Sequence, residues 1–158
     1  MASSGKKPRP QTDIRNAKAG RDYELGERYE AGIVLTGTEV KSIRAGKAQL
    51  ADAYGRIDRG EAFLHNLHIA EYAFGNVNNH LPKRPRKLLL KAREIRKIQV
   101  QLETGGKALV PLRLYFKQAL VKVELALGTG RKLYDKRETL KERVQEREID
   151  RAMNSRHR

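Results

Sequence analysis

Residues 29–36 alternate between apolar and outward-facing positions, which is the pattern of a strand with one buried face. The positions on the buried face are Tyr29, Ala31, Ile33 and Leu35. Glu30 and Gly32 fall on the other face. Packing against a core explains the apolar residues, but it does not require a carboxylate beside a glycine on the outer face. We therefore expect Glu30 and Gly32 to belong to a polar contact surface.

The spacing becomes helical immediately after this strand. Thr38 can cap a short helix, and Gly46 can end it. Val40 and Ile43 would then share one face of the helix. The other side of the helix carries Lys41 and Arg44. The pattern thus predicts an apolar strand that leads into an amphipathic turn with two positive charges directed to solvent.

Alternation elsewhere predicts further strands, at residues 53–57, 62–69, 98–102, 108–116 and 121–127. Helical spacing predicts a helix around residues 88–95 and a shorter one near residues 15–21. Pro111 cannot donate to a strand ladder, so it marks an edge or a bulge. Five to six short strands with glycine turns predict a mainly β protein, a small closed or nearly closed antiparallel barrel. The pattern alone does not separate an oligonucleotide-binding barrel from other small barrels.

The 158 residues have room for one domain with appendages. We expect a disordered basic arm at residues 1–10, the barrel domain at residues 11–129 and a separate tail at residues 130–158. Acidic and basic residues of the tail recur at helical spacing, but no apolar stripe is wide enough to pack on the barrel. We therefore expect a tail that is disordered when free and helical on a partner; a merely solvated charged helix is the alternative.

The chain carries 34 Lys and Arg against 19 Asp and Glu, a net charge of +15. This balance favours a polyanionic partner, most simply nucleic acid, with an anionic membrane surface as the competing choice. No apolar run could span a bilayer and the start lacks a signal-peptide core, so we expect no membrane association. The absence of cysteine excludes disulfides and thiolate zinc sites, and it fits a reducing cytosol.

The longest irregular stretch, residues 70–86, is also strongly basic at its end. Long loops in compact domains are usually functional or disordered, and positive charge favours contact with phosphate. The basic residues concerned are Lys83, Arg84, Arg86 and Lys87.

Motifs of catalysis are missing from the sequence, which has no Gly-rich phosphate loop, Gly-x-Ser-x-Gly elbow or His-Glu-x-x-His helix. His65 and His68 would lie on opposite faces of a strand, so we expect a structural or RNA-contacting role rather than metal binding. Glu30, Glu39 and Asp52 could join them in an acid–base set, but nothing in the spacing requires it. We therefore expect no enzymatic activity, no cofactor and no metal.

Three blocks of the sequence resemble the SsrA-binding proteins (small protein B), the bacterial partners of transfer-messenger RNA in ribosome rescue. They are Tyr-Glu-Ala-Gly-Ile with Gly-Thr-Glu-Val-Lys-Ser-Ile-Arg at residues 29–33 and 37–44, Arg-Pro-Arg-Lys-Leu-Leu-Leu at 84–90, and Gly-Arg-Lys-Leu-Tyr-Asp-Lys-Arg at 130–137. The blocks follow the family order and span nearly the whole chain. Two positions depart from the family: Arg131 stands where lysine is usual, and Ala152 precedes Met153 where many relatives have a bulkier apolar residue.

The resemblance implies an oligonucleotide-binding-type barrel with two or three short helices, in an RNA-binding adaptor of trans-translation. This adaptor would bind the tRNA-like domain of transfer-messenger RNA and deliver it to the A site of stalled ribosomes, together with elongation factor Tu. The RNA-facing residues that the resemblance implies are Asn16, Lys18, Tyr23, Glu30, Gly32, Lys41, Arg44, Arg84, Arg86, Lys87, Leu88 and Leu89.

The resemblance also implies a role for the tail in the decoding centre and message channel of the small ribosomal subunit. There the tail would stand in for codon–anticodon pairing and sense the empty channel. Its implied contact residues are Gly130, Lys132, Tyr134, Asp135, Lys136, Arg137 and Met153. A cytoplasmic, ribosome-associated monomer is expected.

Two other classes of protein remain open. A general single-strand-binding barrel or a ribosomal protein would be expected to carry more aromatic residues on a strand face. An RNA-modifying enzyme would need a set of catalytic residues, which the sequence does not show.

Overall fold

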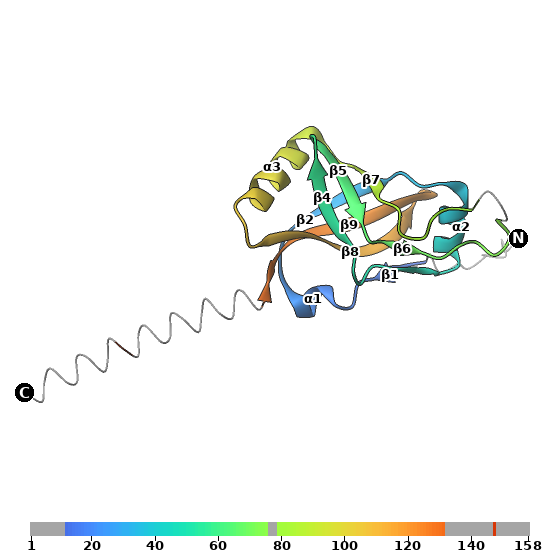
Figure 1. Cartoon of the computed structure of the whole chain (residues 1–158), viewed down its shortest axis with the longest axis horizontal. Helices are drawn as coiled ribbons and strands as arrows, with labels where there is room; N and C mark the ends of the chain where they lie inside the picture. Colours follow the sequence, from blue (N-terminus) through green and yellow to red (C-terminus); the bar gives the residue numbers. More distant parts are fainter. Residues whose placement is uncertain (1–11, 76–78, 132–146, 148–158) are drawn as a thin grey trace, which may run out of the picture.

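The computed structural model describes residues 12–75, residues 79–131 and residue 147. Strands predominate in the described part, and they are joined by short helices (Figure 1). In chain order the elements are β1 (Ile14–Arg15), α1 (Ala19–Asp22), β2 (Tyr23–Ile33), α2 (Gly37–Arg44), β3 (Ala48–Gln49), β4 (Tyr54–Asp58), β5 (Glu61–His65), β6 (His68–Ile69), β7 (Arg86–Leu89), α3 (Ala92–Glu103), β8 (Lys107–Lys117) and β9 (Leu120–Gly130).

The main sheet closes on itself. Strands β8, β4, β5, β7, β2 and β9 are neighbours in this order, all pairs are antiparallel, and β9 pairs again with β8. Strand β1 adds to β8 outside this ring, while β3 and β6 form a separate pair. The prediction of a small closed antiparallel barrel, mainly β and of the oligonucleotide-binding type, is confirmed.

Closure depends on a close approach between β4 and β8. The register joins these strands through the pair Gly55 and Leu109. A Cβ atom on Gly55 would lie 2.3 Å from Leu109 Cδ2, so only glycine lets the two strands come this near. On the other side of β8, the register with β9 shifts between Pro111 and Arg113, so of the edge or bulge predicted at the proline the structure has the bulge.

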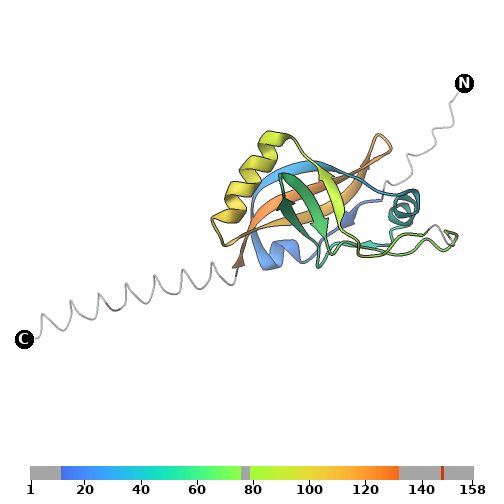
Figure 2. The same cartoon turned by 45° about the horizontal axis from the view of Figure 1, so that its top comes forward.

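The apolar faces of the long strands form the core. Tyr29, Ala31 and Ile33 are buried as the alternation predicts, whereas Leu35 is half-buried. Two helices lie at opposite ends of the barrel, α3 at one and α2 at the other (Figures 1 and 2). Each contributes a fully buried isoleucine, Ile98 and Ile43 respectively. The ends of the barrel are therefore closed by amphipathic helices whose other faces remain in solvent.

The predictions for residues 88–102 were right only for residues 92–95, which are helical as expected. Residues 88–89 belong to the short strand β7 instead of a helix, and residues 98–102 continue the helix α3 where a strand was expected. Glu94 accepts a hydrogen bond of 3.2 Å from the Lys91 amide and so starts the helix. Ile98 and Leu102 then face inward one turn apart, while Val100 is 56% exposed; a strand would have buried all three on one face.

Smaller corrections concern element ends. Helix α2 is capped by Thr36 rather than Thr38, because Glu39 accepts a hydrogen bond of 2.9 Å from the Thr36 amide. The strand predicted at residues 62–69 is interrupted by Asn66, whose φ of 59° lies in the left-handed region. The helix expected near residues 15–21 is the single turn α1. Within the described residues, no helix has both the length and the apolar character needed to cross a membrane.

Candidate nucleic-acid interface

Glu30 lies on the outer face of β2, where the alternation predicted it. Its carboxylate accepts hydrogen bonds from the Tyr115 hydroxyl, at 2.5 Å, and from Lys117 Nζ, at 3.2 Å. The bond from Tyr115, followed by that from Lys117, holds the pKa of Glu30 below its usual 4.5. Burial and the neighbouring Glu30 raise the pKa of Tyr115 to about 12. At neutral pH this site therefore presents an ionised carboxylate and a protonated phenol.

Glu124 on β9 repeats this arrangement beside Glu30. Its carboxylate accepts hydrogen bonds from Arg113 Nε at 2.6 Å and from Arg28 Nη1 at 3.1 Å, and the Arg113 bond is the main reason that its pKa is lowered. The Arg113 guanidinium also lies 4.2 Å from the centre of the Tyr115 ring. We call this surface the ladder face, formed by Arg28, Glu30, Arg113, Tyr115, Lys117 and Glu124.

The ladder face holds its polar groups in fixed positions rather than adding much stability. Partly exposed ion pairs contribute at most about 1 kcal/mol each. Their effect is to orient donors and acceptors on three adjacent strands, β2, β9 and β8. Sequence analysis singled out only Glu30 from this group. The alternation of β8 and β9 places Arg113, Tyr115 and Glu124 on the outer face as well, but the pairing register that joins them to Glu30 is not readable from one strand.

A cluster of predicted residues lies where β2 leads into α2. Lys41 and Arg44 are exposed on the helix, with Lys41 Nζ 5.4 Å from the centre of the Tyr72 ring. Gly32 pairs with Leu89 of β7, and a Cβ atom on Gly32 would lie 3.2 Å from Leu89 Cβ. Leu89 is 55% exposed, so this pair forms a small apolar step beside the basic helix. We call this cluster the α2 end of the barrel.

Two of the predicted RNA-facing residues are buried, and their expected surface role is corrected. Strand β7 alternates strictly, so Arg86 and Leu88 point inward while Lys87 and Leu89 point outward. Arg86 Nε donates to Glu39, its Nη1 donates to the Leu67 carbonyl at 2.5 Å, and its Nη2 donates to the Pro82 carbonyl at 3.1 Å. Arg86 thus ties β7 to α2 and to the loop before β7.

Glu39 is the centre of this buried network. It is fully buried, and it accepts hydrogen bonds from Arg84, Arg86 and the Thr36 amide. Burial by itself would raise the pKa of Glu39, but the bonds from Arg84, Thr36 and Arg86 outweigh it and hold the pKa below 4.5. Arg84 remains partly exposed at 30%. Lys83, Arg84 and Lys87 are therefore the residues of the basic segment that can still reach a ligand.

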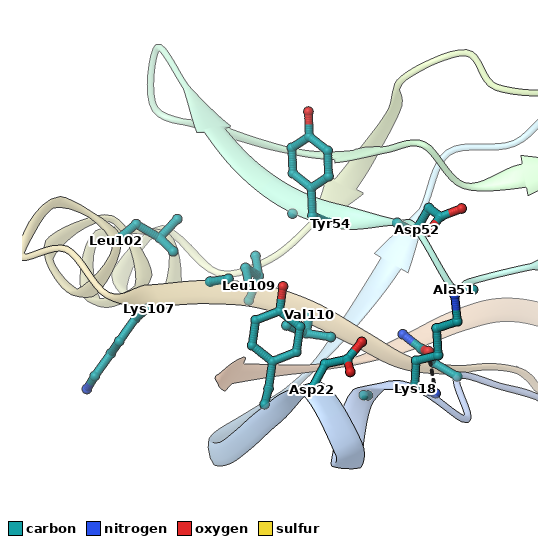
Figure 3. Close-up of a pocket in the computed structure, with 15 residues that line it drawn as sticks. Lys18, Asp22, Ala51, Asp52, Tyr54, Leu102, Lys107, Leu109 and Val110 are labelled. Atoms are coloured by element: carbon teal, nitrogen blue, oxygen red, sulfur yellow. Dashed lines mark hydrogen bonds between the residues drawn. The ribbon is translucent and has the colours of Figure 1, made fainter. Parts of the chain in front are cut away.

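Asn16, Lys18 and Tyr23 line a cavity of about 510 Å³ between α1, β4 and β8. Figure 3 shows Leu109 and Val110 of β8 between Tyr54 of β4 and Asp22 of α1 in this cavity. Asn16 is fixed there, since its Nδ2 donates to the Pro111 carbonyl at 2.9 Å and its Oδ1 accepts from the Lys18 amide at 3.2 Å. These residues supply polar groups to a hollow in the wall of the barrel that also has apolar lining residues such as Leu109 and Val110.

The start of the tail lies at this α1 end. Gly130 pairs with Tyr23 at the end of β9, and Arg131 Nε donates to the Gly20 carbonyl at 3.1 Å. The other predicted tail contacts lie outside the described residues: Lys132, Tyr134, Asp135, Lys136, Arg137 and Met153. The expectations for the arm at residues 1–10 lie outside them as well.

The structure does not bring all of the predicted residues together. Tyr23 and Gly32 lie near opposite ends of β2, an 11-residue strand, so roughly 30 Å separates them. Tyr23 and Gly130 belong to the α1 end, whereas Gly32, Lys41, Arg44 and Leu89 belong to the α2 end. A ligand that contacts both groups must extend along the barrel, or each group serves a different ligand.

Comparison with known proteins agrees with this architecture. The family model described as "SmpB protein" matches residues 13–155. The chain belongs to the SmpB protein family. An SmpB-family relative from Thermobifida fusca, named SsrA-binding protein, is 50% identical over 147 residues, which cover 93% of this chain and 92% of the relative. The SsrA-binding protein of Geobacter sulfurreducens is 56% identical over 138 residues, covering 87% of this chain and 90% of the relative.

A solved structure of an SmpB-family member is also similar. It is described as "tmRNA-SmpB: a journey to the center of the bacterial ribosome", and it aligns with a TM-score of 0.65 at 46% identity. The alignment covers 75% of this chain and 84% of that one. The SmpB signature blocks of this chain fall on β2 with α2, on β7, and on the end of β9 that leads into the tail.

Proposed function

We propose that this protein is the RNA-binding adaptor of trans-translation, which binds the tRNA-like domain of transfer-messenger RNA and delivers it to the A site of stalled ribosomes. Membership of the SmpB family supports this function, since relatives that match about nine-tenths of the chain are named SsrA-binding proteins. A family structure described as tmRNA-SmpB in the bacterial ribosome supports both partners, the RNA and the ribosome.

The observation that carries the proposal is the ionised Glu30 among the cations of the ladder face. Phosphate groups are attracted by lysine and arginine, and such contacts position an RNA without identifying it. A carboxylate that faces RNA has to accept hydrogen bonds from base or ribose groups. Glu30 is held ready for this by Tyr115 and Lys117. We therefore assign to Glu30 the selection of one RNA surface, and to the cations around it the electrostatic attraction.

The grip on the tRNA-like domain is assigned to the ladder face and the α2 end. The exposed cations would contact the phosphate backbone of the RNA there, and the apolar step formed by Gly32 and Leu89 would contact its sugars. The residues assigned to this grip are Glu30, Gly32, Lys41, Arg44, Arg84, Lys87 and Leu89. Arg86 and Leu88 support the grip from the interior, because they fix β7 against α2.

A second contact is assigned to the α1 end. Asn16, Lys18 and Tyr23 line the hollow at the α1 end, and the chain leaves the barrel beside Tyr23, which lies roughly 30 Å from Gly32 along β2. We propose that this end contacts the tRNA-like domain as well, and that the tail, which starts beside it, enters the small ribosomal subunit. The tail would then become helical in the decoding centre and message channel and stand in for codon–anticodon pairing. The tail contacts proposed are Gly130, Lys132, Tyr134, Asp135, Lys136, Arg137 and Met153.

The remaining partners follow from this role. Delivery to the A site would take place with elongation factor Tu, in the bacterial cytoplasm, with one copy of the protein per RNA. A net charge of +15 supports the monomer, because free copies repel one another. The role requires binding and positioning, and none of its steps makes or breaks a covalent bond on this protein.

Equilibrium binding tests the proposal. The full chain is titrated against a transcript of the tRNA-like domain and, as a control, against an elongator tRNA of similar length. We expect tighter binding to the tRNA-like domain at every salt concentration, because base and ribose contacts add to the shared phosphate term. Equal affinity for the two RNAs at all salt concentrations would contradict the proposal and leave only a general basic RNA-binding barrel.

A further inference from the structure

An aromatic side chain stands out from the loop between β6 and β7. Phe74 is 80% exposed. The Tyr72 ring lies edge-on to it, with ring centres 5.5 Å apart and planes at 68°. We call these two residues the aromatic corner. Sequence analysis passed over them, because they lie in an irregular stretch without periodicity.

The aromatic corner is held firmly on α2. The Asn79 side chain bonds the Tyr72 backbone twice, accepting from its amide at 3.0 Å and donating to its carbonyl at 2.7 Å. Next to Asn79, the buried ring of His80 bridges the Thr38 hydroxyl and the Ile69 carbonyl, both at 2.9 Å. The exposed phenyl ring therefore lies two residues after a backbone position, Tyr72, that the Asn79 side chain fixes.

The surroundings of the aromatic corner are basic. Lys41 Nζ lies 5.4 Å from the centre of the Tyr72 ring. Lys83 and Arg84 lie further along the same loop, and the acidic residue Glu71 directly precedes Tyr72. An exposed aromatic ring among cations suits a polyanion that carries flat apolar groups, which is the chemistry of RNA with unstacked bases.

We propose that Phe74 is a stacking platform for an unpaired base of the bound RNA. This inference rests on the proposed function, and it adds a stacking contact to the hydrogen bonds of Glu30 and the charges of the α2 end. The phenyl face would cover the base, while Lys41 and Lys83 would meet the phosphates on either side of it. Base–aromatic stacking tolerates any base, so Phe74 would contribute affinity and register rather than sequence choice.

Two variants and a matched control test the stacking role. Phe74→Ala should weaken binding to the tRNA-like-domain transcript roughly 5- to 150-fold, as the loss of one stacked base does. The slope of log K against log salt should stay that of the parent, because no phosphate contact is removed. Val100→Ala removes another exposed apolar side chain, 56% exposed on α3 at the opposite end of the barrel, and should bind like the parent.

Phe74→Trp supplies a direct signal, because the chain contains no other tryptophan. It should bind like the parent, and its fluorescence should be quenched when the transcript is added. Parental affinity of Phe74→Ala, or unchanged tryptophan fluorescence at saturating RNA, would overturn the inference. Either result leaves the proposed function standing as long as the parent binds the transcript. Failure of the parent to prefer this transcript would instead contradict the proposed function.

Discussion

Glu30 on β2 and Tyr115 on β8 share a hydrogen bond of 2.5 Å that crosses the intervening strand β9. Removal of the carboxylate should therefore disturb recognition more than folding. Glu30→Ala should weaken binding to the tRNA-like domain by about 1–3 kcal/mol, because partner groups on the RNA are left unpaired. Its melting temperature should stay near that of the parent, since the pair lies on the surface.

The control for this variant is Glu103→Ala, which removes an exposed carboxylate from α3 at the other end of the barrel. Filter binding and thermal unfolding are measured for both variants. If Glu30→Ala binds the RNA as tightly as Glu103→Ala does, Glu30 is an ordinary surface charge.

Glu39 should behave in the opposite way, with a large effect on stability. Glu39→Ala should lower the free energy of unfolding by about 3–5 kcal/mol, because it leaves the fully buried Arg86 without its charged partner. Arg84→Ala should cost much less, since Arg84 is 30% exposed and water can replace its contact. Urea denaturation compares the two variants. Equal, small effects would show that the buried pair does not hold β7 on α2.

Acid should weaken the barrel through the same carboxyl group. The pKa of Glu39 is lower in the folded protein than its ordinary 4.5, so the unfolded state binds more protons in acid. The stability that Glu39 contributes is thus complete above pH 4.5 and is lost as the pH falls toward the folded pKa. Unfolding free energies of the parent and of Glu39→Gln are measured across this range. The parent should lose more stability than Glu39→Gln, and identical slopes would contradict the network.

Charge at the α2 end should appear as salt dependence. Replacing Lys41 and Arg44 together by glutamine should reduce the slope of log K against log salt by roughly 1.5–2, because two fewer phosphates are neutralised. The matched control replaces Arg96 and Lys97 by glutamine, which removes two exposed cations from α3. Its slope should stay near that of the parent. A common slope for the two double variants would mean that the α2 end does not contact phosphate.

Sequence periodicity predicted most of the barrel because its long strands have one buried and one solvated face. Tyr29, Ala31 and Ile33 indicate β2 in this way, and Pro111 indicates an edge or a bulge, which the structure shows as the bulge in β8. The second half of helix α3 was predicted wrongly because Ile98, Val100 and Leu102 fit a strand as well as a helix. The capping bond from Lys91 to Glu94 decides between them, and it becomes visible only in three dimensions.

Site residues were predictable only where the alternation of a single strand fixes the face on which they lie. Glu30 was predicted because the alternation of β2 places it on the outer face. Its partners Tyr115 and Lys117 could not be predicted, because they depend on the pairing register of β2, β9 and β8. Arg86 was predicted to face RNA because a basic segment usually lies on the surface. Nothing in its own segment indicates that the buried Glu39 of α2 accepts a hydrogen bond from it. Phe74 has no periodic neighbours, so its exposure could not be predicted.

The division of labour between barrel and tail is the central claim, and truncation after Arg131 tests it most directly. The described contacts of the barrel, including the bond from Arg131 to Gly20, remain in this variant. Binding to the tRNA-like domain and peptidyl transfer to alanyl-transfer-messenger RNA on ribosomes stalled without downstream message are measured in parallel. We predict that RNA affinity stays close to that of the full chain, because the barrel alone binds the RNA. We predict complete loss of peptidyl transfer, because the tail contacts are made only on the ribosome. Full peptidyl transfer by the truncated protein would contradict the adaptor mechanism, and loss of both activities would make the tail part of the RNA grip.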